Sequence, residues 1–465
     1  MQLKKQPVSG MKDILPGEME IRQYLLSKLR SIYSKFGFLE IETPIVEHIS
    51  NLTSSSGWEN EKLIFKVMKR GNSLTSAYAK SINMVKDTPS IFSAMKNDEI
   101  ISDEKLNTLL PEEKERVFIS LGELSEEGLR YDLTLPLCRY YSNNKEGLPT
   151  PFRAMQFGSV FRADRPQKGR FRQFMQCDID IFGDESNISE IEILLATSSF
   201  FKSIDFDQFD FHFVINDRRI LKLLQKYAGF DKDKFEEICI IVDKLDKIGE
   251  NGVKEELISK GFDAKQVDKY ISLISQNNLT DMKTIIINSL GNTVEINSDE
   301  VININEVFDN LEEIIHVVED KTSTTVRFEP NLVRGMGYYT GPIFEMRAKG
   351  FEGSIGGGGR YDNLVGKFTG QNAPACGVSI GFERIVTIIL ENNFELDNET
   401  EESEKIAFLI DKNLSKEKKL QVFTEVYALR STGKTVLVAT MNKNKKYQKE
   451  QLANFGYTSF RDIYE

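Results

Sequence analysis

Two different spacings of apolar residues mark the beginning of the chain. From Glu18 to Phe36 apolar residues recur every three or four positions, which is the spacing of an amphipathic helix, and Gly37 follows directly. In the next stretch, FLEIETPIVE (38–47), apolar and acidic residues alternate, which predicts a strand that is broken at Pro44. We expect this helix and this strand to form an interface.

The pattern changes three times further along the chain. Residues 71–128 lack strong periodicity and are rich in Ser, Asn, Lys and Glu, so we interpret them as an insertion. Three short β-rich runs follow, LRYDLTLPLCRYY, FRAMQFGSVFRAD and FRQFMQCDIDIFG, and they predict hairpins of an antiparallel sheet. From 216 to 320 apolar residues fall at helical spacing among many charges, which predicts a helical insertion.

Beyond residue 320 the β-like pattern returns. The runs TTVRFEPNLV, GYYTGPIFEMRA and SIGGGGRYDNLV predict strands, and GFERIVTIILENN predicts a helix. The sheet is thus interrupted and then resumed, so we expect an α+β core formed by residues 1–215 and 321–392.

The last part of the chain differs in both pattern and charge. Residues 391–404 hold seven acids and no bases, and we expect an acidic linker at 393–404. Residues 405–465 hold twelve bases against six acids, and strand-like runs alternate with helical ones, which predicts a small α/β domain with a parallel sheet. The basic excess favours a contact with RNA, although a solvated lysine face gives the same count.

Composition excludes several classes of protein. No apolar run is long enough to cross a membrane, and the two N-terminal lysines are not followed by the apolar stretch of a secretion signal, so we expect a cytoplasmic protein. The four cysteines form no C-x-x-C pair, and the three histidines lie far from one another and from any cysteine. We therefore predict neither a disulfide framework nor protein-bound zinc.

An arginine-rich segment carries the first candidate chemistry. The stretch VFRADRPQKGRFRQFMQ (160–176) places Arg162, Arg165, Arg170 and Arg172 around a Pro-Gln-Lys-Gly turn. If two strands meet at this turn, several guanidinium groups converge, and guanidinium binds phosphate in a planar, bidentate manner. A solvated basic hairpin is the alternative, and charge alone does not exclude it.

A glycine run provides a second candidate. Four consecutive glycines in GGGGRYD (356–362) leave one face of the backbone bare, so that a flat or charged ligand can approach the main chain. A flexible loop would explain the same run, and no G-x-x-x-x-G-K-[ST] motif occurs in the chain. Arg384, in the helix that follows Gly381, is placed to stack on a base or to reach its phosphates.

These motifs together resemble a known family. The N-terminal helix with the Pro44 strand, the FRAD hairpin and the GFERI helix resemble, in order and spacing, the three signature motifs of class II aminoacyl-tRNA synthetases. LVRGMGYYTGPIFE (332–345) resembles the signature of histidyl-tRNA synthetases, and LRYDLT and RPQKGRFRQF fit the same family. The resemblance covers about residues 8–390 and, more weakly, the tail.

The resemblance implies a fold and a reaction. The fold is a mostly antiparallel sheet flanked by helices, with a helical insertion and a C-terminal α/β domain that binds the anticodon. The enzyme is a homodimer that uses the N-terminal helix and the Pro44 strand as its interface. It joins L-histidine to ATP, with Mg²⁺, to give histidyl-adenylate and pyrophosphate, and then transfers the histidyl group to histidine tRNA.

The resemblance also implies roles for individual residues. Arg162 and Arg334 hold the α-phosphate from two sides and are the expected catalytic residues, because positioned cations stabilise the charge that gathers on phosphorus. The expected ATP site contains Arg162, Asp164, Arg170, Phe174, Gly357, Gly358 and Arg384, with adenine between Phe174 and Arg384. The expected histidine site contains Asp132, Thr134, Gln176, Asp180, Arg334, Tyr338 and Tyr339. Arg165 and Gln167 match positions that meet the acceptor end of the tRNA.

Some of these assignments have competing explanations. Tyr338 and Tyr339 would otherwise be ordinary strand packing, Arg165 a solvent salt bridge, and Asp178 and Asp180 strand-surface charges. We favour Asp180 as functional and leave Asp178 open. The sequence identifies no protein ligand for Mg²⁺.

The sequence departs from the family pattern in two places. The insertion at 71–128 is longer than expected, and the domain at 405–465 is shorter than the usual anticodon-binding domain. A histidine-binding regulatory paralogue that charges no tRNA is the rival interpretation. Such paralogues lose the motif arginines, whereas Arg162, Arg334 and Arg384 are all present.

Overall fold

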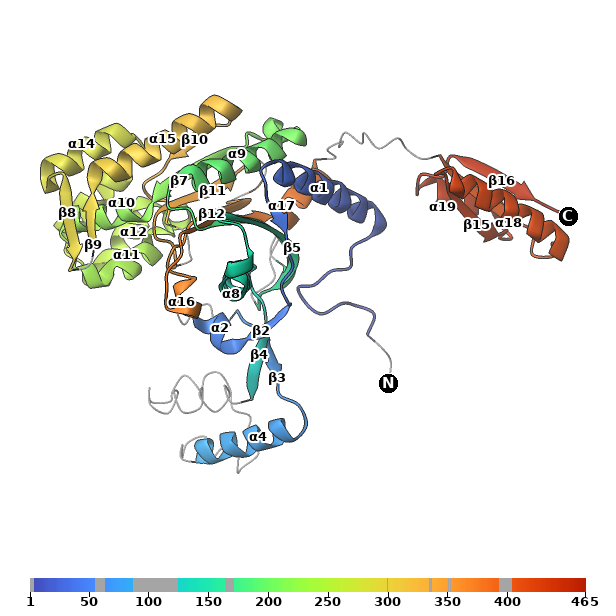
Figure 1. Cartoon of the computed structure of the whole chain (residues 1–465), viewed down its shortest axis with the longest axis horizontal. Coiled ribbons are helices and arrows are strands. Elements are labelled where there is room, and N and C mark those ends of the chain that lie inside the picture. The colour runs from blue at the N-terminus through green and yellow to red at the C-terminus, as the bar shows by residue number, and fades with distance from the viewer. Residues whose placement is uncertain are drawn as a thin grey trace. The chain divides into compact units, whose positions relative to one another are not determined.

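A computed structural model describes most of the chain as two compact units. The described residues are 4–54, 63–86, 124–163, 171–298, 300–333, 337–349, 351, 353–392 and 404–465. The first unit comprises Met1–Glu395 and the second Leu396–Glu465, so the division falls inside the predicted acidic linker. Figure 1 shows the helices and strands of both units.

An eight-stranded sheet organises the first unit. Its strands follow the order β1-β5-β6-β13-β12-β11-β7-β10. The two edge pairs, β1 with β5 and β7 with β10, are parallel, and every pair between them is antiparallel. The strands are β1 (Leu39–Glu40), β5 (Phe152–Phe161), β6 (Gln173–Phe182), β7 (His212–Asp217), β10 (Val326–Phe328), β11 (Pro342–Arg347), β12 (Gly356–Arg360) and β13 (Ala375–Gly381). The predicted α+β fold with an interrupted, mostly antiparallel sheet is confirmed.

Four helices cover one face of this sheet (Figure 1): α1 (Pro16–Lys35), α9 (Ile188–Ser203), α15 (Ile304–Thr322) and α17 (Phe382–Glu391). Helix α1 forms where the apolar spacing predicts a helix, because Leu25, Leu29 and Tyr33 are fully buried on one side. It ends where Gly37 takes a positive φ of 79°, a conformation that glycine adopts without strain.

The run LRYDLTLPLCRYY does not form the strand that the sequence predicts. Strand β4 (Ser125–Leu129) ends at its first residue, and most of the run is helix α8 (Thr134–Asn144). The carboxylate of Asp132 accepts a hydrogen bond from the backbone N–H of Leu135 at 3.2 Å, which satisfies a donor at the start of the helix. Leu and Tyr fit either element by pattern, and burial of Cys138 and Tyr141, three positions apart, favours the helix here.

The segment around Pro44 contributes to two sheets. After β1 the chain continues into β2 (Val46–His48), which pairs with β4 in a three-stranded sheet completed by β3 (Lys66–Met68). Helix α2 (Ile49–Ser54) follows β2, and helix α4 (Gly71–Lys86) begins at the start of the predicted insertion. Of that predicted segment, 87–123 lies outside the described residues.

The region predicted as a helical insertion contains helices and one hairpin. The hairpin pairs β8 (Thr293–Asn297) with β9 (Glu300–Asn303), which the sequence analysis does not anticipate. The helices before α15 are α10 (Arg218–Ala228), α11 (Phe235–Val242), α12 (Leu245–Ser259), α13 (Ala264–Ile274) and α14 (Leu279–Leu290). Helix α16 (Gly366–Thr369) is a short turn in the core beyond them.

The second unit is an alternation of strand and helix. Its elements are β14 (Lys405–Ile410), α18 (Lys416–Ser431), β15 (Thr435–Thr440), α19 (Lys445–Ala453) and β16 (Ser459–Ile463). The strands lie parallel in the order β15-β14-β16, as the alternating pattern predicts. Phe408, Val422 and Val426 are central to its apolar core. Across both units, none of the described helices combines the length and apolar character that a membrane crossing requires.

Candidate active site

A cavity of about 250 Å³ lies over the middle of the large sheet, where β6, β12 and β13 run side by side. The start of helix α8 and the residues before β11 close its sides. Its lining residues are Asp132, Thr134, Arg162, Gln176, Asp180, Tyr338, Tyr339, Gly357, Gly358, Tyr361, Gly377, Val378 and Ser379. The sequence-predicted positions among these come from several separate stretches of the chain, and the fold brings them to one place.

Asp180 is the most strongly perturbed acid that lines this cavity. The hydroxyl of Tyr361 donates a hydrogen bond to Oδ1 of Asp180, and Oδ2 has no partner among the described residues. Burial raises the pKa of Asp180 to about 7, with the Tyr361 hydrogen bond acting to lower it and the charge of Asp132 to raise it. The carboxyl group therefore changes charge near neutral pH.

Asp132 and Gln176 provide two further acceptors. Oδ1 of Asp132 is used by the N–H of Leu135, whereas Oδ2 has no partner in the described part of the chain, and burial raises the pKa of this carboxyl. The side-chain amide of Gln176 donates to Oγ of Ser379 at 2.8 Å, which leaves Oε1 of Gln176 without a described partner. Thr134 lines the cavity in the first turn of α8.

Three tyrosine rings form one wall. The ring centroids of Tyr338 and Tyr339 are 4.8 Å apart, and the ring of Tyr338 meets that of Tyr361 edge-on at 5.9 Å. Aromatic contacts of this kind hold the rings in place. The wall is thus apolar on its ring faces, and the hydroxyl of Tyr361 is used by Asp180.

Glycines form the floor because the neighbouring backbone leaves no room for side chains. A Cβ atom on Gly358 would lie 1.9 Å from the carbonyl oxygen of Gly377, and a Cβ atom on Gly377 would lie 1.8 Å from Oδ1 of Asp180. The sequence interpretation attributes Gly357 and Gly358 to the approach of a ligand. The close packing of β12 against β13 is an additional reason, and at Gly377 the reason is Asp180 itself.

Arg162 lies at one edge of the cavity, at the end of the β5–β6 hairpin. Its Nε atom donates to the backbone oxygen of Tyr131 at 3.0 Å, and its guanidinium carbon lies 5.1 Å from the ring centroid of Phe174. Phe174 does not itself line the cavity. The backbone and ring contacts hold the Arg162 guanidinium at the cavity edge, and its charge lowers the pKa of Asp132 against the larger effect of burial.

Arg384 lies near the start of α17. Its contacts include a hydrogen bond to the backbone oxygen of Ser354 and the ring of Phe351, whose centroid is 5.4 Å from the guanidinium carbon. The expected placement of adenine between Phe174 and Arg384 requires no contact between these two side chains, so it stays a prediction. Five other expected site residues lie outside the described residues: Asp164, Arg165, Gln167, Arg170 and Arg334.

Four residues of the cavity are not predicted from the sequence: Tyr361, Gly377, Val378 and Ser379. Tyr361 lies within the motif GGGGRYD, and the other three lie in β13, just before the GFERI helix, so each lies in or beside a motif that the sequence interpretation uses. The signal that places them is strand pairing, because Gly377 lies opposite Asp180 and Ser379 lies opposite Asp178. Such pairing is not visible in the sequence.

Asp178, which the sequence left open, lies between Gln176 and Asp180 on β6 but does not line the cavity. It is 1% exposed, and neither carboxylate oxygen has a partner among the described residues. Burial raises the pKa of Asp178 well above the ordinary range, with the charge of Asp180 acting in the same direction.

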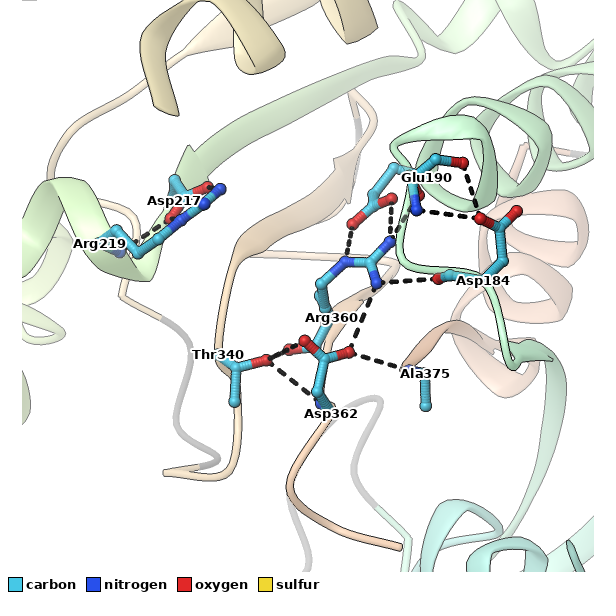
Figure 2. Close-up of polar contacts among 9 residues, drawn as sticks. Asp184, Glu190, Asp217, Arg219, Thr340, Arg360, Asp362 and Ala375 are labelled. Atoms are coloured by element: carbon cyan, nitrogen blue, oxygen red, sulfur yellow. Dashed lines mark hydrogen bonds and ion pairs between the residues drawn. The ribbon is translucent and has the colours of Figure 1, made fainter. Parts of the chain in front are cut away.

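Arg360, which is not among the residues that line the cavity, anchors the end of the glycine strand through several polar contacts (Figure 2). Its guanidinium donates to both carboxylate oxygens of Glu190, at 2.6 and 2.7 Å, and to the backbone oxygen of Asp184 at 3.1 Å. Asp362 accepts hydrogen bonds from the N–H of Ala375 and from this arginine, so the chain on both sides of Tyr361 is held in place.

No group of three or more His, Cys, Asp or Glu side chains is arranged to hold a metal ion within the described ranges. The four cysteines are buried and unpaired.

Comparisons with known proteins agree with this architecture. A sequence profile described as "Histidyl-tRNA synthetase" matches residues 108–385. The histidine–tRNA ligase of Leifsonia xyli subsp. xyli is 35% identical over 461 residues, which cover 98% of this chain and 94% of that protein. The histidine–tRNA ligase of Cytophaga hutchinsonii is 33% identical over 414 residues, which cover 87% of this chain and 81% of that protein.

Two solved structures share the fold. The histidyl-tRNA synthetase from Nostoc sp. PCC 7120 superposes with a TM-score of 0.70 at 24% identity and covers 98% of this chain and 90% of that chain. A protein from Bacillus halodurans C, described as an ATP phosphoribosyltransferase regulatory subunit/histidyl-tRNA synthetase, superposes with a TM-score of 0.69 at 16% identity, with coverage of 100% and 99%.

The sheet, its helices and the sequence comparisons together define a class II aminoacyl-tRNA synthetase. The sequence relationships then specify which one, because they extend over most of the chain. The chain belongs to the histidyl-tRNA synthetase family and is an enzyme of the histidine–tRNA ligase type.

Proposed function

We propose that the chain joins L-histidine to ATP as histidyl-adenylate and then transfers the histidyl group to histidine tRNA. One observation carries the proposal: Oδ2 of Asp132, Oε1 of Gln176 and Oδ2 of Asp180 lie on one cavity, and each lacks a partner among the described residues. Unpaired buried acceptors cost free energy, so they are expected where a ligand supplies the donors. The ammonium group and the ring N–H of histidine are such donors.

The proposed histidine pose follows from the two ends of the cavity. Asp180 accepts the ring N–H, and Tyr338 and Tyr339 meet the other ring nitrogen from the aromatic wall. An amino acid without these ring groups leaves buried polar atoms unpaired, which is a strong form of rejection. The ammonium group meets the polar residues at the start of α8 and on β6: Asp132, Thr134 and Gln176.

The proposed ATP site adjoins Arg162. As in the family, Arg162 and Arg334 hold the α-phosphate while the histidine carboxylate attacks it, and the pentavalent phosphorus gathers charge that these cations stabilise. Adenine lies on Phe174, with Arg384 as its other neighbour. Asp164, Arg170, Gly357 and Gly358 complete the proposed ATP-binding set.

Mg²⁺ enters this proposal with ATP, whose phosphates are its natural ligands, and when bound it neutralises charge on the departing pyrophosphate. No protein residue is assigned to it.

Partners of the enzyme are part of the same proposal. Arg165 and Gln167 contact the acceptor end of histidine tRNA, and the basic domain at 405–465 contacts the anticodon. Two chains associate through α1 and the Pro44 segment in a cytoplasmic homodimer. The rival, a catalytically silent regulatory paralogue, would bind histidine but charge no tRNA.

The experiment is pyrophosphate exchange into ATP with each of the twenty amino acids, run beside charging of histidine tRNA. We expect exchange that depends on histidine alone. Binding of histidine without exchange would favour the regulatory paralogue, and exchange without charging would contradict the proposed contacts with tRNA.

A further inference from the structure

Glu383 joins three elements at the edge of the site. Its Oε2 accepts a hydrogen bond from Nη1 of Arg22 at 2.7 Å, and its Oε1 accepts one from Nη2 at 2.8 Å. Oε1 also accepts the backbone N–H of Met175 at 3.1 Å. Arg22 lies on α1, Glu383 in the first turn of α17 and Met175 on β6, and both charged side chains are less than one-tenth exposed.

The carboxylate of Glu383 takes the place of the next β13 carbonyl at the point where β13 ends. The pairing of β13 with β6 stops at Gly381, opposite Gln176, and the chain then turns into α17. The next N–H along β6 towards the hairpin belongs to Met175, and the carboxylate of Glu383 accepts it in place of a backbone carbonyl. The bidentate contact with Arg22 fixes the direction of that carboxylate.

This arrangement matters more for Phe174 than for its neighbour Gln176. Gln176 is paired on both sides, with Gly158 of β5 and Gly381 of β13. Phe174 has only Val160 of β5 opposite it in the described sheet, because β13 does not extend so far. On the side of β6 that faces β13, the hydrogen bond from the N–H of Met175 to Glu383 therefore restrains this end of the strand.

We propose that Glu383 is a positioning residue for the nucleotide: it fixes β6 beside Phe174, and Arg22 aims its carboxylate from helix α1. The inference rests on the proposed function, in which adenine lies on Phe174. A simpler alternative exists, since a buried ion pair between two helices could serve the stability of the core alone. The two explanations differ in what the Met175 contact does.

Two variants separate them. Glu383→Gln keeps the shape of the side chain but removes the charge that Arg22 orients, and we expect the KM for ATP to rise about tenfold, the size of losing one charge-assisted hydrogen bond. The KM for histidine should stay unchanged, because Gln176 is held independently. The double variant Arg22→Glu/Glu383→Arg restores opposite charges, but its guanidinium has only donors and cannot accept the N–H of Met175.

The double variant is expected to regain the melting temperature lost in Glu383→Gln while its KM for ATP stays high. Recovery of both quantities, or a KM for ATP that is unchanged in Glu383→Gln, would overturn the proposal. Glu18→Gln is the matched control, because Glu18 also contacts Arg22, at 3.4 Å, but does not touch β6. If the double variant does not fold, Glu383→Gln alone tests the proposal: its KM for ATP should rise while its KM for histidine stays unchanged.

Calorimetric titration of each variant with ATP makes the result independent of catalysis. If the wild-type chain shows no exchange with any amino acid, the proposed function fails. Weaker ATP binding by Glu383→Gln than by Glu18→Gln would still support the positioning role, and equal binding would refute it.

Discussion

The hydroxyl of Tyr361 donates a hydrogen bond to Asp180, a buried acid whose pKa is about 7. The tyrosine follows the glycine strand and the aspartate lies two strands away, with β13 between them in the sheet. Because the hydrogen bond favours the charged form of the acid, Tyr361 helps to set the pH at which the site carries its negative charge.

Replacing Tyr361 with Phe should move the pH dependence of histidine use. We expect kcat/KM for histidine to rise as the pH passes through about 7, because in the proposed function the ionised carboxylate of Asp180 accepts the ring N–H of histidine. Without the hydroxyl the pKa of Asp180 rises further, so the increase should occur at higher pH. Pyrophosphate exchange measured between about pH 6 and 9 checks this, with Tyr24→Phe as a control outside the cavity. A profile identical to the wild type would contradict the role of Tyr361.

Replacing Asp180 with Asn should stabilise the protein at high pH. The folded-state pKa of about 7 lies above the ordinary value of 3.8, so the stability that comes from binding this proton is full below about pH 4 and is lost as the pH rises through 7. At about pH 8 the variant should exceed the wild type in free energy of unfolding by up to about 4 kcal/mol, and the gain should shrink at about pH 5. Urea unfolding at the two pH values measures it. Activity with histidine should fall at the same time, and a variant that is destabilised at the higher pH would refute the burial argument.

Adding one carbon to Gly377 should disturb the site directly. The Cβ of Gly377→Ala would lie 1.8 Å from Oδ1 of Asp180, so the carboxylate or the strand must move. We expect kcat/KM for histidine to fall about 10- to 100-fold, the range for overpacking a filled site. Gly147→Ala is the control, since a Cβ there meets nothing within 4 Å. Equal activity of the two variants would show that Asp180 can shift without loss.

Removing the guanidinium of Arg162 should slow adenylate formation. We expect Arg162→Ala to lower histidine-dependent exchange by roughly 100- to 1,000-fold, the scale for losing one transition-state stabiliser. Arg172→Ala is the matched variant, because the backbone N–H of Arg162 donates to the oxygen of Arg172 on the same hairpin. Similar losses of exchange activity in both variants would show that the positive charge of the hairpin as a whole matters, and would contradict a specific role of Arg162.

Arg360→Met should cost stability, because it leaves the carboxylate of Glu190 buried without its partner (Figure 2). Loss of one partner of a buried pair typically costs about 3 to 5 kcal/mol, against at most about 1 kcal/mol for an exposed pair. Arg30→Met removes such an exposed pair, with Glu40 at 2.9 Å, and serves as the comparison. Urea unfolding curves of the two variants should differ by most of that amount, and overlapping curves would contradict it.

Elements with a strong local pattern could be predicted from the sequence. Helix α1 and the β5–β6 hairpin form where apolar spacing and turn residues agree. Helix α8 could not be predicted in this way, because its start depends on Asp132 and its inner face on burial against the sheet. Tertiary packing overrides a run that fits either element.

The candidate site shows the same division. Motifs in the sequence alone point to Asp132, Gln176 and Asp180, because their spacing resembles a family. Tyr361 and Ser379 depend on the register of three strands that are distant in sequence, and no local pattern carries that information. The contact of Arg384 with Phe351 is likewise a property of the folded chain.

Arg360 and Tyr361 are neighbours in sequence that serve opposite sides of one sheet, the first bound to Glu190 and the second to Asp180. Successive side chains of an extended strand point in opposite directions, so a slip of one residue would carry the guanidinium into the cavity and withdraw the phenol from it. The ion pair between Arg360 and Glu190 therefore fixes the register of the glycine strand, and with it the position of Tyr361 in the cavity. An insertion or deletion in the glycine run should abolish recognition of histidine even where the chain still folds.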